Sequence, residues 1–254
     1  GIGTGRAVRV GVRCDRSDVP SDPTNLAARA ATMILTECGL GGEVELAIVK
    51  RIPPGAGLGG GSGNAATVLT TLNEILDLDL PAARLHTLAL ALGADVPFFL
   101  TGGCARVRGI GERIDPIPGW PGQGIIVALP PVAVATAWAF RTYAAGLFPE
   151  ADEPARLAAL GKLDPALLRN DLEAAVLPVH PEIGRLKTSL VESGAAGAVM
   201  SGSGSAVVGL VPEGTSADAV ASALRARHPE VGVHVARILG AGVSPSVDPT
   251  SSYA

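Results

Sequence analysis

The chain has 254 residues, of which 47% are hydrophobic and 17% are charged, so it can bury one large core or two modest ones. A formal net charge of −4, without basic stripes or interleaved aromatics, excludes the electrostatic pattern of a nucleic-acid-binding protein. No apolar run approaches the ~20 residues needed to span a bilayer, and no basic segment leads into an apolar one at the start, so we expect a cytoplasmic protein.

The first half of the chain alternates between strand and helix patterns. Period-two alternation predicts strands over residues 6–13 and 43–51, and helical spacing predicts a helix over residues 25–38. After a glycine-rich stretch, helices are expected over the following ranges: 64–76 and 81–93. A hairpin around residues 109–111 and a buried strand over 124–131 complete this half.

The second half begins with helical patterns and ends with strands. Helices are predicted over residues 136–147, 170–176, 181–195 and 216–228, and strands over 196–200, 206–211 and 231–239. Residues 241–254 lack apolar periodicity and are expected to form a frayed tail. The mixture excludes an all-α or all-β fold. It predicts two α+β domains, over residues 1–130 and 131–240.

Three cysteines, Cys14, Cys38 and Cys104, are unequally spaced, with no CxxC pair and no nearby histidine pair. This pattern argues against a disulfide framework or a zinc site. We expect all three to be small buried hydrophobic residues.

Residues 51–67 read "RIPPGAGLGGGSGNAAT", a glycine-rich turn between a predicted strand and a predicted helix. Glycine allows successive N–H groups to point inward, and the helix start presents free N–H groups to the same anion. The pattern therefore predicts a phosphate site, to which Ser62 can add a hydroxyl and Asn64 a helix cap or a phosphate contact. No lysine follows the glycines, so charge neutralisation is expected from Mg²⁺. A flexible linker is the alternative, which Pro53, Pro54 and the alanine-rich helix fit poorly.

The stretch "PPGAGLGGGSGNAATVL" resembles the ATP loop of the GHMP kinases, which include galactokinase, homoserine kinase and mevalonate kinase. Four further stretches are similar to that family: "DPTNLAARAA" (22–31), "LGADVPFFLTGGCARVRGIGE" (92–112), "NDLE" (170–173) and "MSGSGSAVVGL" (200–210). GLGGGS, where many members have GLGSS, favours the branch that phosphorylates the 2-hydroxyl of 4-diphosphocytidyl-2-C-methyl-D-erythritol in the non-mevalonate isoprenoid pathway.

The resemblance implies a two-lobed α+β GHMP-kinase-like fold, with the glycine-rich ATP loop in the N-terminal lobe and an α/β sandwich in the C-terminal lobe. It implies ATP and Mg²⁺ as cofactors and the cytidine diphosphate methylerythritol as a small-molecule substrate. The residues implied to bind ATP are Pro53, Pro54, Gly55, Ala56, Gly57, Leu58, Gly59, Gly60, Gly61, Ser62 and Gly63. Asn25 and Lys50 are implied to approach the adenine, although each alone is typical of a solvated surface position.

Asp95 lies between a predicted helix and the apolar "VPFF", at an expected helix-to-strand junction. A buried carboxylate must be paired or functional, and a structural cap explains the position equally well. The resemblance implies that Asp95 is the catalytic base, which accepts the proton of the substrate hydroxyl during transfer of the γ-phosphoryl group.

Thr136 is predicted to cap a helix on which Phe140 lies one turn later, on the same face. The resemblance implies that Thr136 contacts the substrate and that Phe140 stacks on the cytosine. It also implies that the second glycine stretch, "SGSGS" over residues 201–205, packs beside the ATP loop. Taken alone, that stretch is a hairpin turn.

Members of the family usually open with a segment resembling Pro-Ala-Lys-x-Asn-Leu and Gly-Tyr-His, which supplies a lysine near the transferred phosphoryl group. Nothing in the chain matches it, and we expect the sequence to be part of a longer protein. Two other functions stay open: another GHMP small-molecule kinase, or a nucleotide-binding protein without turnover.

Overall fold

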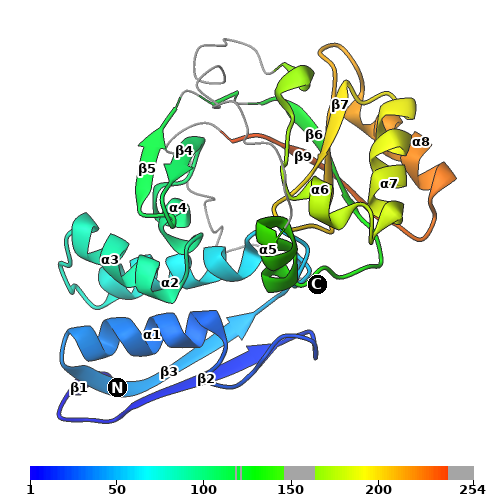
Figure 1. Cartoon of the computed structure of the whole chain (residues 1–254). Helices are drawn as coiled ribbons and strands as arrows, with labels where there is room; N and C mark the ends of the chain where they lie inside the picture. The colour runs from blue at the N-terminus through cyan, green and yellow to red at the C-terminus, as the bar shows by residue number, and fades with distance from the viewer. Residues whose placement is uncertain (118, 121, 146–163, 240–254) are drawn as a thin grey trace. The chain divides into compact units, whose positions relative to one another are not determined.

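The computed structural model describes residues 1–117, 119–120, 122–145 and 164–239 (Figure 1). The chain forms two compact units. The first contains Gly1–Val49 and Gly61–Gly119, and the second contains Lys50–Gly60 and Trp120–Ile238. The chain thus passes from one unit to the other within the glycine run, between Gly60 and Gly61. The domain boundaries expected near residues 130 and 240 stay predictions, and the expected tail lies outside the described residues.

The first unit is built on a three-stranded sheet. Its strands, in the spatial order β1-β3-β2, are β1 (Gly3–Thr4), β2 (Val8–Cys14) and β3 (Leu40–Ile48). β2 and β3 run parallel, and β1 is antiparallel to β3. Parallel neighbours need a crossover, and helix α1 (Leu26–Glu37) supplies it and contacts both strands. The strand, helix and strand predicted here are confirmed, and the two-residue β1 is too short to show a period.

Three more helices complete the first core: α2 (Gly60–Ile75), α3 (Ala82–Leu92) and α4 (Val96–Thr101). Their apolar faces meet α1 around fully buried side chains that include Ile34, Leu69, Ala89 and Val96. α2 and α3 confirm two predicted helices, but α2 begins four residues before the predicted residue 64. Asn64 is therefore inside the helix, and its expected cap role is wrong.

α4 corrects the strand that was expected at "VPFF". Pro97 occupies the first turn, where its missing N–H costs nothing, and Gly102 ends the helix with a φ of +65°. A six-residue apolar run is too short for its period to separate helix from strand.

The predicted hairpin after α4 is confirmed as the antiparallel pair β4 (Ala105–Arg108) and β5 (Arg113–Pro116). Its turn contains Gly111, which is buried and has a φ of +105°. A Cβ on Gly111 would lie 2.0 Å from the carbonyl oxygen of Ala94. The turn therefore packs directly on the residue that precedes Asp95.

The second unit holds a four-stranded antiparallel sheet in the order β7-β8-β6-β9. The strands are β6 (Gly124–Leu129), β7 (Gly197–Met200), β8 (Val207–Leu210) and β9 (Gly232–Arg237). Val127 in β6 pairs with Val208 on one side and His234 on the other. All four strands were predicted.

Helices α7 (Pro181–Glu192) and α8 (Ala217–Arg227) lie along this sheet (Figure 1). Between helices and sheet lies a second core, whose fully buried side chains include Ile126, Ile183, Leu190 and Leu224. Pro181 is in the first turn of α7, where proline is favoured, and the Ser216 hydroxyl caps α8 by accepting from Ala219 N. The unit also contains α5 (Thr136–Ala145) and the short α6 (Glu173–Val176).

The three cysteines have free thiols and are half-buried, so the expectation that they are buried is wrong. Desolvation nonetheless raises the pKa of the Cys38 and Cys104 thiols. Among the described residues, no helix is both long and apolar enough to cross a membrane.

Candidate active site

The first glycine loop, residues 55–62, has a backbone that requires glycine at alternate positions. Gly55, Gly57 and Gly59 have φ values of +68°, +73° and +67°, which disfavour any side chain. α2 begins at Gly60, so the last three residues of the loop form the first turn of the helix and contribute N–H groups that have no partner within the helix. This succession of left-handed glycines and a helix start is the geometry that binds anions through main-chain N–H groups.

The second glycine loop, residues 201–205, packs against the first through one side-chain hydroxyl and main-chain atoms. The Ser201 hydroxyl donates to the Gly57 carbonyl oxygen at 3.0 Å, and Ala206 N donates to the Ala56 carbonyl oxygen at 3.1 Å. A Cβ on Gly57 would lie 2.1 Å from the Ser201 carbonyl oxygen, so position 57 has no space for a side chain. The packing that the resemblance implied is confirmed.

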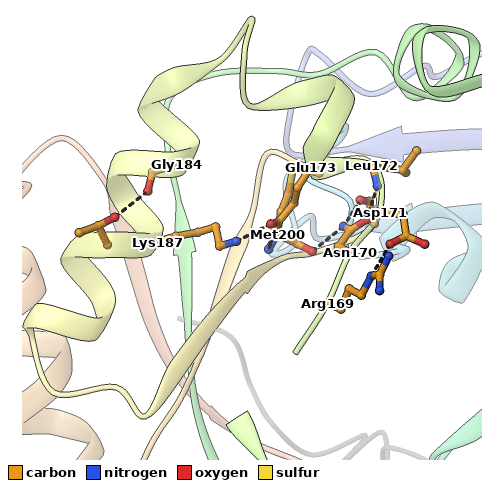
Figure 2. A network of polar contacts seen from close by, with 10 residues as sticks. Arg169, Asn170, Asp171, Leu172, Glu173, Gly184, Lys187 and Met200 are labelled. Atoms are coloured by element: carbon orange, nitrogen blue, oxygen red, sulfur yellow. Dashed lines mark hydrogen bonds and ion pairs between the residues drawn. The ribbon is translucent and has the colours of Figure 1, made fainter. Parts of the chain in front are cut away.

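Two further segments of the second unit hold the second glycine loop. The hydroxyls of Thr136 and Ser203 lie 2.9 Å apart, and the Ser205 hydroxyl donates to the Val132 carbonyl oxygen. On another side, Asn170 donates to the carbonyl oxygens of both Met200 and Gly202 at 2.7 Å (Figure 2). Sequence reasoning noted the "NDLE" stretch but missed this role, because the contact joins residues about thirty positions apart.

Thr136 and Phe140 lie one turn apart on α5, and both are exposed. Thr136 is not the helix cap that was predicted: the Ala135 carbonyl accepts from Trp138 N and Ala139 N, so the helix already begins at Thr136. Its hydroxyl faces the second glycine loop instead. The Phe140 side chain is 56% exposed, so packing in the core does not explain an aromatic residue at this position. Their substrate contacts stay predictions.

Asp95 lies in the first unit, immediately before α4. The residue is exposed, which corrects the expectation of a buried carboxylate, and its side chain does not cap the helix. Its surroundings are nonetheless fixed, since Ala94 contacts the hairpin turn. Phe99, one turn into α4, contacts the first turn of α2 at Gly63. Asp95 thus immediately precedes a helix that packs against the beginning of α2, and its catalytic role stays a prediction.

Asn25 and Lys50 differ from the solvated residues that they resemble in isolation. Asn25 is 7% exposed and caps α1: its Oδ1 accepts from Ala27 N at 3.0 Å, and its Nδ2 donates to the Pro20 carbonyl oxygen at 2.7 Å. Lys50 is half-buried, and its Nζ lies 3.4 Å from the position that a Cβ on Gly60 would take. A lysine that precedes the glycines therefore reaches the start of α2. The adenine contacts of both residues stay predictions.

Two of the histidines have partners other than the residues of the glycine loops. His180 lies edge-on to Trp138 and 3.3 Å from Glu182, and His228 lies 2.8 Å from the Ser189 hydroxyl. Within the described ranges, no three His, Cys, Asp or Glu side chains gather as a metal cluster would require.

Comparison with known proteins gives one consistent result. Residues 25–103 match the GHMP kinases N terminal domain, and residues 147–230 match the GHMP kinases C terminal family. A 4-diphosphocytidyl-2-C-methyl-D-erythritol kinase from Gloeobacter violaceus is 42% identical over 242 residues, covering 91% of this chain and 80% of the relative. The enzyme of the same name from Geobacter sulfurreducens is 42% identical over 217 residues, covering 85% and 77%.

Solved structures agree with these sequences. A crystal structure of 4-(cytidine 5'-diphospho)-2C-methyl-D-erythritol kinase has a TM-score of 0.75 at 35% identity and covers 95% of this chain and 85% of its own. A homoserine kinase from Cytophaga hutchinsonii has a TM-score of 0.73 at 19% identity, covering 94% and 85%, which shows a shared fold alone. The chain therefore belongs to the GHMP kinase family and has its α+β fold.

Proposed function

We propose that the protein transfers the γ-phosphoryl group of ATP to the 2-hydroxyl of 4-diphosphocytidyl-2-C-methyl-D-erythritol, in the cytoplasm. The observation that carries the proposal is the first glycine loop, with three left-handed glycines leading directly into α2. Relatives about 40% identical over most of the chain bear the name of this kinase, and that supports the choice of substrate.

The loop fits the phosphates of ATP because it leaves no space for side chains and offers main-chain donors. A Cβ at Gly57 would meet the second glycine loop, so the two loops lie in close contact at Gly57. Mg²⁺ bound with ATP would neutralise phosphate charge. Such an ion usually keeps several water ligands and is bound by one or two carboxylates together with substrate phosphates.

Asp95, Phe140 and Thr136 would each have a different role in an in-line phosphoryl transfer. Asp95 would accept the proton of the attacking hydroxyl while the hydroxyl oxygen bonds to the γ-phosphorus and ADP leaves. Phe140 would stack on the cytosine ring, and Thr136 would contact the substrate close to its hydrogen bond with Ser203. Such catalysis consists mainly of positioning and charge stabilisation, which loops and single carboxylates can supply.

A substrate panel tests the proposal. The protein, ATP and Mg²⁺ are incubated with the cytidine diphosphate methylerythritol, homoserine, mevalonate or galactose, and ADP release and the ³¹P spectrum of the product are followed. We expect phosphorylation of the first compound alone. Phosphorylation of another alcohol would favour a different GHMP kinase, and ATP binding without any product would favour a nucleotide-binding protein without turnover.

A further inference from the structure

Two side chains of the "NDLE" stretch, residues 170–173, form hydrogen bonds with one short segment of main chain (Figure 2). They are Asn170 and Glu173. That segment of main chain, Met200–Gly202, is the beginning of the second glycine loop. We propose that Asn170 and Glu173 are positioning residues for the phosphate-binding loop and act on it through the second glycine loop. The inference rests on the proposed function, because it assumes that the first glycine loop binds the phosphates of ATP.

Asn170 uses both ends of its amide. Its Nδ2 donates to the Met200 and Gly202 carbonyl oxygens, both at 2.7 Å, so the amide bridges the residues on either side of Ser201. Its Oδ1 accepts from Leu172 N at 3.0 Å, which fixes the plane of the amide. The NH₂ group has two hydrogens and can donate to both carbonyl oxygens at once, whereas an ionised carboxylate of the same shape only accepts and would repel them.

Glu173 fixes the neighbouring strand end with its carboxylate. Its Oε1 accepts from Met200 N at 2.8 Å, and its Oε2 forms an ion pair with Lys187 of α7. The side chains of Lys187 and Glu173 are only 23% and 17% exposed, so solvent screens this pair weakly. Both hydrogen-bonding groups of Met200 are therefore held by the same stretch, at the point where β7 passes into the loop.

The second glycine loop contacts Gly57 directly, so a displacement of this loop would also displace Gly57. The Ser201 hydroxyl, between the two carbonyl oxygens that Asn170 holds, donates to the Gly57 carbonyl oxygen. A Cβ on Gly202 would lie 2.9 Å from the same oxygen, so the two loops already touch at this point. Gly57 has no side chain that could adjust to a shift of Ser201, so its main chain would have to move.

Neighbouring charged residues lack this connection. Arg169 and Asp171 flank Asn170 and bind each other at 2.6 Å, at the protein surface. Glu192 and Arg227 form a similar exposed pair at 2.8 Å on α7 and α8. These residues provide matched controls, since their side chains can be neutralised without touching either glycine loop.

The test compares Asn170→Asp, Glu173→Gln and Ser201→Ala with the controls Asp171→Asn and Glu192→Gln. Calorimetry measures the affinity for ATP and for adenosine, which lacks phosphates, and steady-state assays give kcat and KM for ATP. For Asn170→Asp and Ser201→Ala we expect ATP affinity to fall about tenfold, with adenosine affinity changed less than about twofold. Glu173→Gln keeps an acceptor for Met200 N but loses the charge opposite Lys187, so its effect should have the same selectivity and be smaller.

Equal losses for ATP and adenosine, or ATP losses no larger than those of the controls, would overturn the inference. If Asn170→Asp does not fold, the milder Glu173→Gln and Ser201→Ala variants decide. A wild-type protein that binds ATP but leaves the proposed substrate unchanged would refute the proposed function, while the ATP and adenosine comparison would still decide the inference. A wild-type protein that binds no ATP would refute both.

Discussion

Asp95 lies immediately before α4 and its carboxylate is exposed, which changes the expected effect of replacing it. A buried carboxylate would cost free energy on burial, and its replacement could stabilise the fold. An exposed one that does not cap its helix has little effect on stability in either direction. A replacement of Asp95 can therefore change activity without changing the free energy of unfolding.

Asp95→Asn should lower the rate of phosphoryl transfer by roughly 10² to 10⁴, the usual contribution of a general base. The free energy of unfolding should stay within about 0.5 kcal/mol of wild type, as for most surface substitutions. Single-turnover assays and thermal melts on the same sample measure both quantities. A folded variant with near-normal turnover would refute the catalytic assignment.

Phe140→Ala should weaken substrate binding by about 1–3 kcal/mol, the range found for aromatic stacking on a base. ATP affinity and stability should barely change, because the ring is 56% exposed and contributes little to the core. Val179→Ala, at a residue 58% exposed in the same unit, is the control for losing an exposed apolar side chain. An equal fall in ATP affinity would mean that Phe140 shapes the protein and not the cytidine site.

At the scale of elements, the sequence predicted those helices and strands whose hydrophobic pattern repeats over several turns or several strand residues. α1, α3, α7, α8 and the four strands of the second sheet fall within a few residues of their predicted ranges. The strand expected at "VPFF" was a helix, and the start of α2 was placed too late. In both places the run is short or glycine-rich, so no period marks it, and tertiary packing decides the conformation.

In the candidate site, too, a continuous sequence pattern could be predicted, whereas contacts set by tertiary packing could not. The first glycine loop is continuous in sequence, so its pattern could be recognised. The links from Asn170 to Met200 and from Ser201 to Gly57 join residues that only the folded sheet brings together. The burial of Asn25 also depends on the fold, because an N-cap looks the same in sequence as a surface asparagine.

Gly57→Ala tests the contact between the two loops. Its φ of +73° and a Cβ position 2.1 Å from the Ser201 carbonyl oxygen mean that the methyl group must displace one loop. We expect ATP affinity to fall at least tenfold, or about 1.4 kcal/mol. Gly214→Ala is the matched control, because Gly214 has a φ of +77° but open space around its Cα. It should lose about 1–2 kcal/mol of stability from the left-handed backbone and no ATP affinity.

Gly59→Val should block nucleotide binding as well, since Gly59 has a φ of +67° and a β-branched residue strongly disfavours that conformation. The fold should remain largely intact, because the loop lies outside both cores. Calorimetry with ATP and circular dichroism decide between these outcomes. Unchanged ATP affinity in either glycine variant would contradict phosphate binding by this loop.

At the scale of the whole molecule, the net negative charge of the chain means that local groups must attract ATP. The chain carries 20 Lys and Arg against 24 Asp and Glu, and its net charge of −4 does not attract a polyphosphate. Screening limits the effect of distant charges to about 8–10 Å at ordinary ionic strength. The attraction must therefore be local, and its sources include the main-chain N–H groups of the first glycine loop, the nearby ammonium of Lys50, and Mg²⁺ carried with the nucleotide.

Removal of Mg²⁺ distinguishes these sources. If the metal supplies most of the neutralising charge, an excess of EDTA should lower ATP affinity by at least about tenfold, or 1.4 kcal/mol. Adenosine affinity should not change, because adenosine carries no phosphate, and it serves as the control for any effect of the chelator on the fold. Lys50→Met, measured with Mg²⁺ present, should then have the smaller effect, since the metal would carry two charges and Lys50 carries one at the start of α2, where its Nζ lies 3.4 Å from the position of a Cβ on Gly60. The opposite order, with ATP affinity insensitive to EDTA but strongly reduced in Lys50→Met, would assign the neutralising charge to the lysine and show that the loop binds phosphate without a metal.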